Sequence, residues 1–150
     1  MADRRIRVPK DKEALIVKLT KTDDSSGGIF QTRAHLMTFA AVYGFSRGPR
    51  IRFNDSLEPI RHEVFARQGH DTIINLLALA ATEDPKCLAQ NDEAENLRAT
   101  IFEEYANAGL DHLRTELHGV DDPLEHLLLL IQQQRQGNGG KEEFDLTKFL

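Results

Sequence analysis

The sequence predicts a mainly α-helical protein, a helical bundle with a small two-stranded antiparallel ribbon formed by residues near 5–8 and 50–53. Two observations indicate this fold class. Apolar residues recur at helical spacing through most of the chain. The alternation of arginine with an apolar residue occurs twice, as RIRV at 5–8 and as RIRF at 50–53. Such alternation is typical of a half-buried strand, so we expect the two tetrapeptides to pair.

The predicted ribbon has one apolar face and one basic face. Its inward residues are Ile6, Val8, Ile51 and Phe53, and its outward residues are Arg5, Arg7, Arg50 and Arg52. Pro9 ends the first strand, because proline cannot donate a hydrogen bond to a sheet. The apolar side chains should close over the helices and leave the four arginines in solvent.

Two helices are predicted between the halves of the ribbon. Asp11 can cap a short apolar helix in the segment KEALIVKLT, which ends at the polar loop TDDSSGG. Residues 29–45, IFQTRAHLMTFAAVYGF, are apolar on nearly all sides, which is typical of a helix buried on more than one face. Gly44 and the turn at 46–49 end this second helix.

The second half of the chain is predicted to be helical throughout. A helix should run from Ser56 to Gly69, and the apolar segment TIINLLALAATE after Asp71 is predicted to be the central core helix. A longer amphipathic helix should start at Asn91 or Asp92. Gly109 within it either breaks the helix or allows a close approach of two backbones. Asp122-Pro123 opens a last helix, LEHLLLLIQQQR.

The length of 150 residues corresponds to about one domain. We expect a single helical domain with the N-terminal ribbon over residues 1–136, and a flexible Gly-rich linker with an apolar tail over 137–150. The tail is expected to bind a partner through Phe144, Leu146, Phe149 and Leu150. Its target is open: its own helices, a neighbouring subunit or a larger protein. No signal-peptide core or bilayer-spanning run occurs, so we expect a cytoplasmic protein without membrane contact.

Charge is distributed unevenly along the chain. Residues 1–61 carry twelve Lys and Arg against seven acids, a net charge of +5, and the other 89 residues carry seven against seventeen, a net charge of −10. The basic end could meet an anion such as nucleic acid, and the acidic end could meet a basic protein surface or keep the protein in solution. Both could also be ordinary solvated faces.

No arrangement of residues predicts an enzyme. The chain has no GxSxG, phosphate-binding or dinucleotide motif, and the adjacent acids Glu103 and Glu104 point different ways on a helix. Three histidines near acids, His112, His118 and His126, could in principle bind a metal, but histidines at helix ends among surface acids are common, so no metal site is predicted. The single cysteine, Cys87, is expected to be a small buried apolar residue. We therefore expect a non-enzymatic protein without a cofactor.

The first 45 residues, read as strand, helix and helix, resemble the ribbon-helix-helix regulators, in which the N-terminal strand enters the major groove. The resemblance covers less than a third of the chain. It departs from the pattern because the loop TDDSSGG is long and because RIRF offers the first strand a partner in the same chain. A transcriptional regulator of this type is one alternative function, and a purely protein-binding module is another.

Four blocks cover more of the chain: RIRVPKDKE, IFQTRAHLMTFAAVYGF, EPIRHEVFARQGHDTIINLLALA and IFEEYANAGLDHL. Together they resemble the small bacterial family of DNA phosphorothioation (dnd) system-associated protein 4. The resemblance implies a gene beside those that replace a non-bridging phosphate oxygen of DNA by sulfur, or that restrict unmarked DNA, in phage defence. It implies no catalytic residue.

The leading hypothesis is therefore a non-enzymatic accessory or adaptor protein of a phosphorothioate modification and restriction system. Its partners would be double-stranded DNA, proteins of the modification or restriction machinery, and a second copy of the chain in a homodimer. The candidate DNA contacts are Arg5, Arg7, Arg33, Arg47, Arg50 and Arg52.

Overall fold

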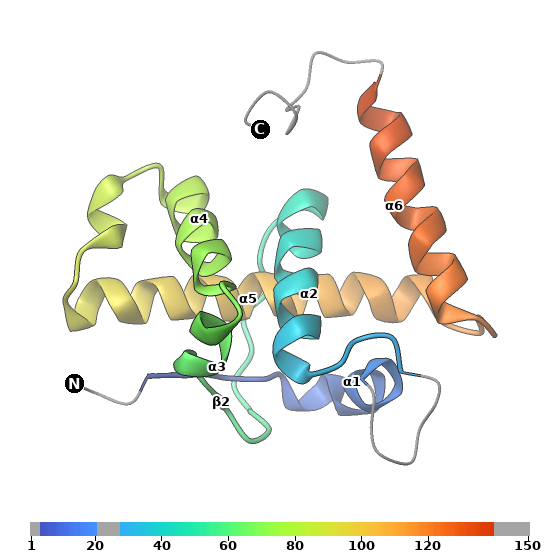
Figure 1. The fold of residues 1–150 in the computed structure, drawn as a ribbon, viewed down its shortest axis with the longest axis horizontal. Coiled ribbons are helices and arrows are strands. Elements are labelled where there is room, and N and C mark those ends of the chain that lie inside the picture. Colours follow the sequence, from blue (N-terminus) through green and yellow to red (C-terminus); the bar gives the residue numbers. More distant parts are fainter. Residues whose placement is uncertain (1–3, 21–27, 140–150) are drawn as a thin grey trace. The chain divides into compact units, whose positions relative to one another are not determined.

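The computed structural model describes residues 4–20 and 28–139, in which helices dominate and one small antiparallel sheet forms (Figure 1). The predicted fold class is confirmed. The elements are β1 (Arg5–Ile6), the 3₁₀ helix η1 (Lys10–Lys12), α1 (Glu13–Leu19), α2 (Arg33–Arg47), β2 (Ile60–Arg61), α3 (His62–Arg67), α4 (Asp71–Thr82), the 3₁₀ helix η2 (Pro85–Leu88), α5 (Asp92–Glu116) and α6 (Pro123–Gly139). The chain divides into two compact units, Met1–Glu116 and Leu117–Leu150, which are described separately.

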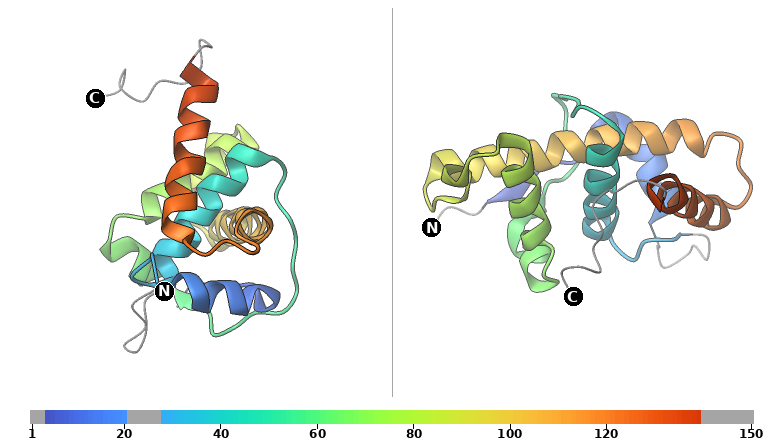
Figure 2. Two further views of the ribbon diagram at one scale, coloured as in Figure 1. Left: turned by 90° about the vertical axis from the view of Figure 1, so that its right-hand side faces the viewer. Right: turned by 90° about the horizontal axis from the view of Figure 1, so that it is seen from above.

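The long helix α5 is the centre of the first unit. Asn91 caps it, accepting a hydrogen bond from the backbone N–H of Ala94 at 2.8 Å, and acidic residues in its first turn suit the positive end of the helix dipole. Figure 2 (left) looks along α5: α2 and α4 lie on one side of it, and the segment between α2 and β2 passes on the other. Side chains on several faces of α5 are therefore buried.

The helix α2 packs against α5 with almost no space between the two backbones. A Cβ atom on Gly109 would lie 1.8 Å from the carbonyl oxygen of Ala40, and one on Gly44 would lie 2.1 Å from the carbonyl oxygen of Tyr105. Gly109 thus allows a close approach and does not break α5, which settles the two alternatives left open by the sequence. The prediction that α2 is buried on more than one face is also confirmed.

The helix α4 was predicted to be the central helix, and this prediction is wrong. Its Leu76 is 55% exposed, and only one face of α4 packs on the rest of the unit. Ala78 on that face meets Ile101 of α5 and the buried Cys87 of η2. Cys87 is thus a small buried apolar residue, as expected. Some apolar side chains of α4, such as Leu76, are therefore not covered by the neighbouring helices.

The sheet differs from the predicted ribbon in its second strand. β1 pairs with β2, with Arg5 opposite Arg61 and Ile6 opposite Ile60, and does not pair with residues 50–53. The pairing extends past β1, because the backbone of residues 8–10 also exchanges hydrogen bonds with Asp55 and Leu57. The two inward isoleucines are buried, so the alternation of apolar and basic residues in β1 is confirmed.

Residues 50–53 bind α5 where the sequence predicted a strand. The N–H of Ile51 donates to the carbonyl oxygen of Glu104 at 3.1 Å, and its carbonyl oxygen accepts from the Asn107 side chain at 3.1 Å. Because these backbone groups are satisfied by a helix, they are not available to β1. Ile51, predicted inward, is 39% exposed. The helix predicted from Ser56 starts only at His62, because residues 55–61 pair with the N-terminal segment.

The second unit contains α6. Pro123 occupies its first position, and Asp122 caps it by accepting a hydrogen bond from the N–H of Glu125 at 3.2 Å, as the sequence predicted. The helix extends to Gly139, so residues 137–139 of the predicted linker are helical. The predicted division at residue 136 stays a prediction. Over the described part of the chain, no helix is long and apolar enough to cross a membrane.

Candidate functional site

Two adjacent glutamates on α5 hold the arginines of the two repeated tetrapeptides. Glu103 binds Arg7, whose backbone N–H and Nε donate to its two carboxylate oxygens at 2.7 and 3.1 Å. Glu104 binds Arg50, with 3.0 Å between Nε and Oε1. Neighbouring residues on a helix point about 100° apart. One glutamate therefore reaches the end of β1, and the other reaches the segment after α2.

The two ion pairs join nearly buried glutamates to partly exposed arginines. The side chains of Glu103 and Glu104 are only 4% and 9% exposed, whereas those of Arg7 and Arg50 are each 38% exposed. Burial raises the pKa of Glu103, and its hydrogen bonds and charge interaction with Arg7 oppose that rise. The guanidinium of Arg7 also lies 4.6 Å from the centre of the Phe53 ring. Arg7 and Arg50 are therefore committed to contacts within the chain.

Arg5 and Arg33 meet around Glu58 in the segment before β2. The closest charged atoms of Arg5 and Glu58 are 3.9 Å apart, and Arg33 Nη1 donates to the Glu58 carbonyl oxygen at 2.9 Å. The side chains of Arg5 and Glu58 are 44% and 80% exposed. Solvent screens an ion pair this exposed, so this pair holds Arg5 only weakly.

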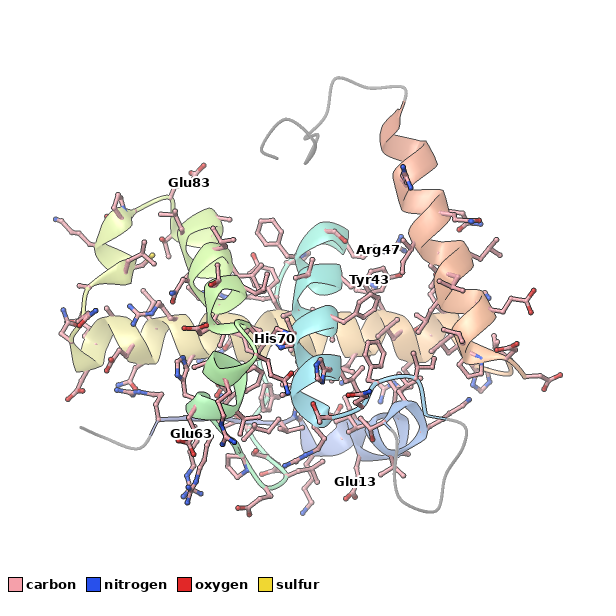
Figure 3. The ribbon with its side chains drawn as sticks, in the orientation of Figure 1. Glu13, Tyr43, Arg47, Glu63, His70 and Glu83 are labelled. Atoms are coloured by element: carbon pink, nitrogen blue, oxygen red, sulfur yellow. The ribbon has the colours of Figure 1, made fainter. Side chains whose placement is uncertain are left out.

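Arg47 lies in the last turn of α2 (Figure 3). Its guanidinium carbon is 5.8 Å from the centre of the Tyr43 ring, one turn earlier on the same helix. Burial raises the pKa of the Tyr43 hydroxyl, and the charge of Arg47 opposes that rise. The position suits a cation near the C-terminal end of a helix.

Arg52 lines a cavity of about 540 Å³ between η1, the segment 51–55 and α5. Arg52 and Lys10 are both exposed. Within the described ranges, neither side chain makes an ion pair or a hydrogen bond. The cavity is lined by Lys10, Asp11, Lys12, Ile51, Arg52, Phe53, Asn54, Asp55, Asn107, Asp111 and Arg114. Of the six predicted arginines, Arg33 and Arg52 line cavities and make no ion pair within the described residues, and of these two only Arg52 makes no side-chain hydrogen bond there.

Lys12 forms a buried part of the same cavity wall. Its side chain is 3% exposed, and its Nζ donates to Asp11 Oδ2 at 2.9 Å and to Asn107 Oδ1 at 3.0 Å. The hydrogen bond from Lys12 lowers the pKa of Asp11, so Asp11 stays ionised at neutral pH. Another acid that lines the cavity, Asp111, is bound by Arg114 at 2.8 Å.

Four residues of this cavity were not predicted from the sequence: Lys10, Lys12, Asn107 and Arg114. Asn107 and Arg114 share one face of α5, being seven residues apart, but nothing in the sequence indicates that η1 packs against that face. Two lysines directly after a strand-ending proline were the available signal. The predicted partner residues Phe144, Leu146, Phe149 and Leu150 lie outside the described residues.

Across residues 4–20 and 28–139, no three or more His, Cys, Asp and Glu side chains come together in a group that could hold a metal ion.

Comparison with known proteins identifies the family. A model of the family DNA sulphur modification system-associated protein 4 matches residues 5–149, nearly the whole chain. The chain belongs to this family. Neither a curated protein nor a solved structure matches it. Membership of the DNA sulphur modification system-associated protein 4 family associates the chain with a DNA sulphur modification system and confirms the resemblance seen in the sequence blocks.

Proposed function

We propose that this protein is a non-enzymatic accessory factor of a DNA sulphur modification system, and that it contacts the phosphate backbone of DNA through Lys10 and Arg52. The observation that carries the proposal is the pair of cations itself. Both side chains are exposed, line one cavity and make no ion pair in the described parts of the chain. Unpaired cations on a surface are the groups that neutralise phosphates and release counterions.

The contacts of the other arginines support this choice of residues. Arg7 and Arg50 each bind the carboxylate of a buried glutamate, so a phosphate would have to compete with that carboxylate. Arg5 and Arg33 near Glu58 are available as secondary contacts, because their interactions are exposed. The DNA-contacting surface is therefore proposed to centre on Lys10 and Arg52, with Arg5 and Arg33 on its periphery.

The accessory role is supported by what the acidic residues do. A catalytic carboxylate must be able to reach a substrate, but Glu103 and Glu104 are buried and engaged by arginines. The description of the family as system-associated also fits a protein that assists an enzyme. We propose that the partner proteins are those of the sulphur modification or restriction machinery.

The test is duplex DNA binding measured by fluorescence anisotropy over a range of salt concentrations. Binding should weaken steeply with salt, and the slope of log K against log salt should fall by about 2 in Lys10→Ala/Arg52→Ala, since each lost phosphate contact removes about 0.9. The control is Arg67→Ala/Lys86→Ala, which removes the same charge from α3 and η2 of the first unit, outside the lining of this cavity, and should keep the wild-type slope. Two unrelated duplexes should give equal slopes.

Two results would contradict the proposal. One is no duplex binding at about 50 mM salt, where electrostatic binding is strong. The other is an equal loss of slope in both double variants, which would assign binding to net charge and not to this surface. A strong preference for a palindromic duplex by a dimer would instead favour a transcriptional regulator.

A further inference from the structure

The cavity beside Lys10 and Arg52 has the dimensions of a ligand site. Its volume of about 540 Å³ lies in the range of small-molecule pockets, roughly 300–1,000 Å³. Three separate parts of the chain form its wall: η1, the segment 51–55 and one face of α5. The segment 51–55 is fixed by the two hydrogen bonds of Ile51 to α5. The wall is therefore a built part of the fold.

The buried amine of Lys12 provides an anchor for an anion. An ammonium group has three N–H donors, and the hydrogen bonds to Asp11 and Asn107 use two of them. The nearest oxygen of Asp111 is 4.0 Å away, which is too far for a third hydrogen bond. One donor of a side chain that is 97% buried is thus left for a ligand oxygen, next to the open cations Lys10 and Arg52.

The charge of the lining limits the kind of anion. Four cations and three acids line the cavity, for a net charge of +1. Two of the acids are engaged, Asp11 by Lys12 and Asp111 by Arg114, and the third, Asp55, would repel additional negative charge. A phosphodiester, with a single negative charge, fits this balance better than a triphosphate does.

An apolar wall lies next to the cations. Ile51 is 39% exposed although it is fixed to α5, and the half-buried Phe53 ring is held by the guanidinium of Arg7. Both residues line the cavity. An aromatic ring beside a cation is the usual arrangement for a nucleotide, whose base stacks on the ring while the phosphate meets the cation.

We propose that this cavity binds one nucleotide unit, with its phosphate on Lys12, Lys10 and Arg52 and its base against Ile51 and Phe53. In DNA, such a unit is an unpaired nucleotide, because a paired base is stacked inside the duplex. The inference deepens the proposed function, on which it rests in placing DNA at this surface. The shared chemistry is a nucleoside phosphate, either free or within a single strand.

The experiment compares four probes on the full chain: an eight-nucleotide oligothymidylate, a duplex of the same length, thymidine monophosphate and inorganic phosphate. Intrinsic tyrosine fluorescence or calorimetry reports binding. Phe53→Leu keeps an apolar side chain beside Arg7 but removes the flat ring, and should weaken single-strand binding about tenfold, within the range for loss of one stacked base. Arg52→Gln should weaken single-strand binding more than Phe53→Leu does, and Asp55→Asn should strengthen single-strand binding relative to the wild type.

The control variants are Leu88→Ala and Lys86→Gln, which remove an apolar and a basic side chain at η2 and should leave binding unchanged. Circular dichroism melting of each variant establishes that it is folded. Lys12→Gln should also weaken single-strand binding. Because Lys12 is buried, this variant is compared with the wild type only if the two melting temperatures are close.

The outcomes separate the two proposals. Single-strand binding that exceeds duplex binding and depends on Phe53 and Arg52 supports the nucleotide site. Thymidine monophosphate binding with the same residue dependence also supports it and assigns a free nucleotide as the source. Salt-dependent duplex binding with no single-strand preference and no effect of Phe53→Leu overturns the nucleotide site and leaves the proposed function standing. Equal affinity for inorganic phosphate and thymidine monophosphate overturns it too. Failure to bind any DNA contradicts the proposed function, and failure to bind either DNA or thymidine monophosphate contradicts both proposals.

Discussion

The contact between α2 and α5 makes a strong prediction for Gly109→Ala. On an ordinary helix this substitution stabilises, because alanine has a helix propensity about 1 kcal/mol better than glycine. Here the new Cβ would lie 1.8 Å from the Ala40 carbonyl oxygen, whereas an ordinary contact is at least 3.4 Å. The two backbones must therefore separate by about 1.6 Å at the crossing, which is the difference between these two distances.

The cost of that separation exceeds the gain in helix propensity. Overpacking a core by one methyl group typically costs about 1–3 kcal/mol, and more where the clash is with backbone that no rotamer change can relieve. We expect a net loss of about 3 kcal/mol. In a chain of 150 residues this lowers the melting temperature by about 10 °C. Urea and thermal unfolding of the full chain, followed by far-ultraviolet circular dichroism, measure both quantities.

A double-mutant cycle identifies the contact. A Cβ on Gly44 would meet the same crossing, 2.7 Å from the backbone nitrogen of Gly109. Once one alanine has separated the helices, the second should cost less, so Gly44→Ala/Gly109→Ala should lose less stability than the sum of the single variants. Thr115→Ala, on the exposed part of α5, should be nearly neutral. A Gly109→Ala variant as stable as the wild type would refute the reasoning.

Two further predictions concern single glutamates. Burial raises the pKa of Glu103 above its ordinary 4.5, so folding favours its protonated form, and the stability that this group contributes falls as the pH rises from 4.5 through its folded pKa. The free energy of unfolding of the wild type minus that of Glu103→Gln, from urea titrations at pH 4 to 7, should therefore decrease with pH; a flat or rising difference would count against this. Glu83 adopts a left-handed conformation with φ 55° at the end of α4 (Figure 3). Glu83→Gly should raise the free energy of unfolding by about 0.5 kcal/mol, whereas Glu83→Ala should give no such gain.

The helices could be predicted from the sequence because their signals are local. The cap at Asn91, the proline at 123 and the apolar spacing along α5 each act within one or two turns. The second strand could not be predicted, because RIRF has as clear a strand pattern as RIRV. What decides the pairing is a long-range competition: the backbone of Ile51 binds α5 and leaves residues 55–61 as the partner of the N-terminal segment.

The division of charge was harder to interpret from sequence. The basic first part and the acidic second part suggested two external partners, but much of this complementarity is satisfied inside the chain. Arg4 pairs with Glu95, Arg7 with Glu103 and Arg50 with Glu104, all of them acids on α5. Charge counts along a sequence do not show which charges meet after folding. The exposed cations without an ion pair, Lys10 and Arg52, could therefore be identified only once the structure showed which cations are paired.

The pairs made by Glu103 and Glu104 have a consequence for how the chain folds. Arg7 and Glu103 are 96 positions apart in the sequence, and Arg50 and Glu104 are 54 positions apart, because both glutamates lie in the middle of α5. Contacts this distant form slowly, since a long loop must close first. During synthesis, Arg7 of the N-terminal segment therefore lacks its carboxylate partner until residue 103 has left the ribosome, and this segment cannot complete its packing against α5 before then. Until then its buried residues Ile6 and Val8 stay exposed to aggregation, so translation speed through α5 should affect the yield of folded protein.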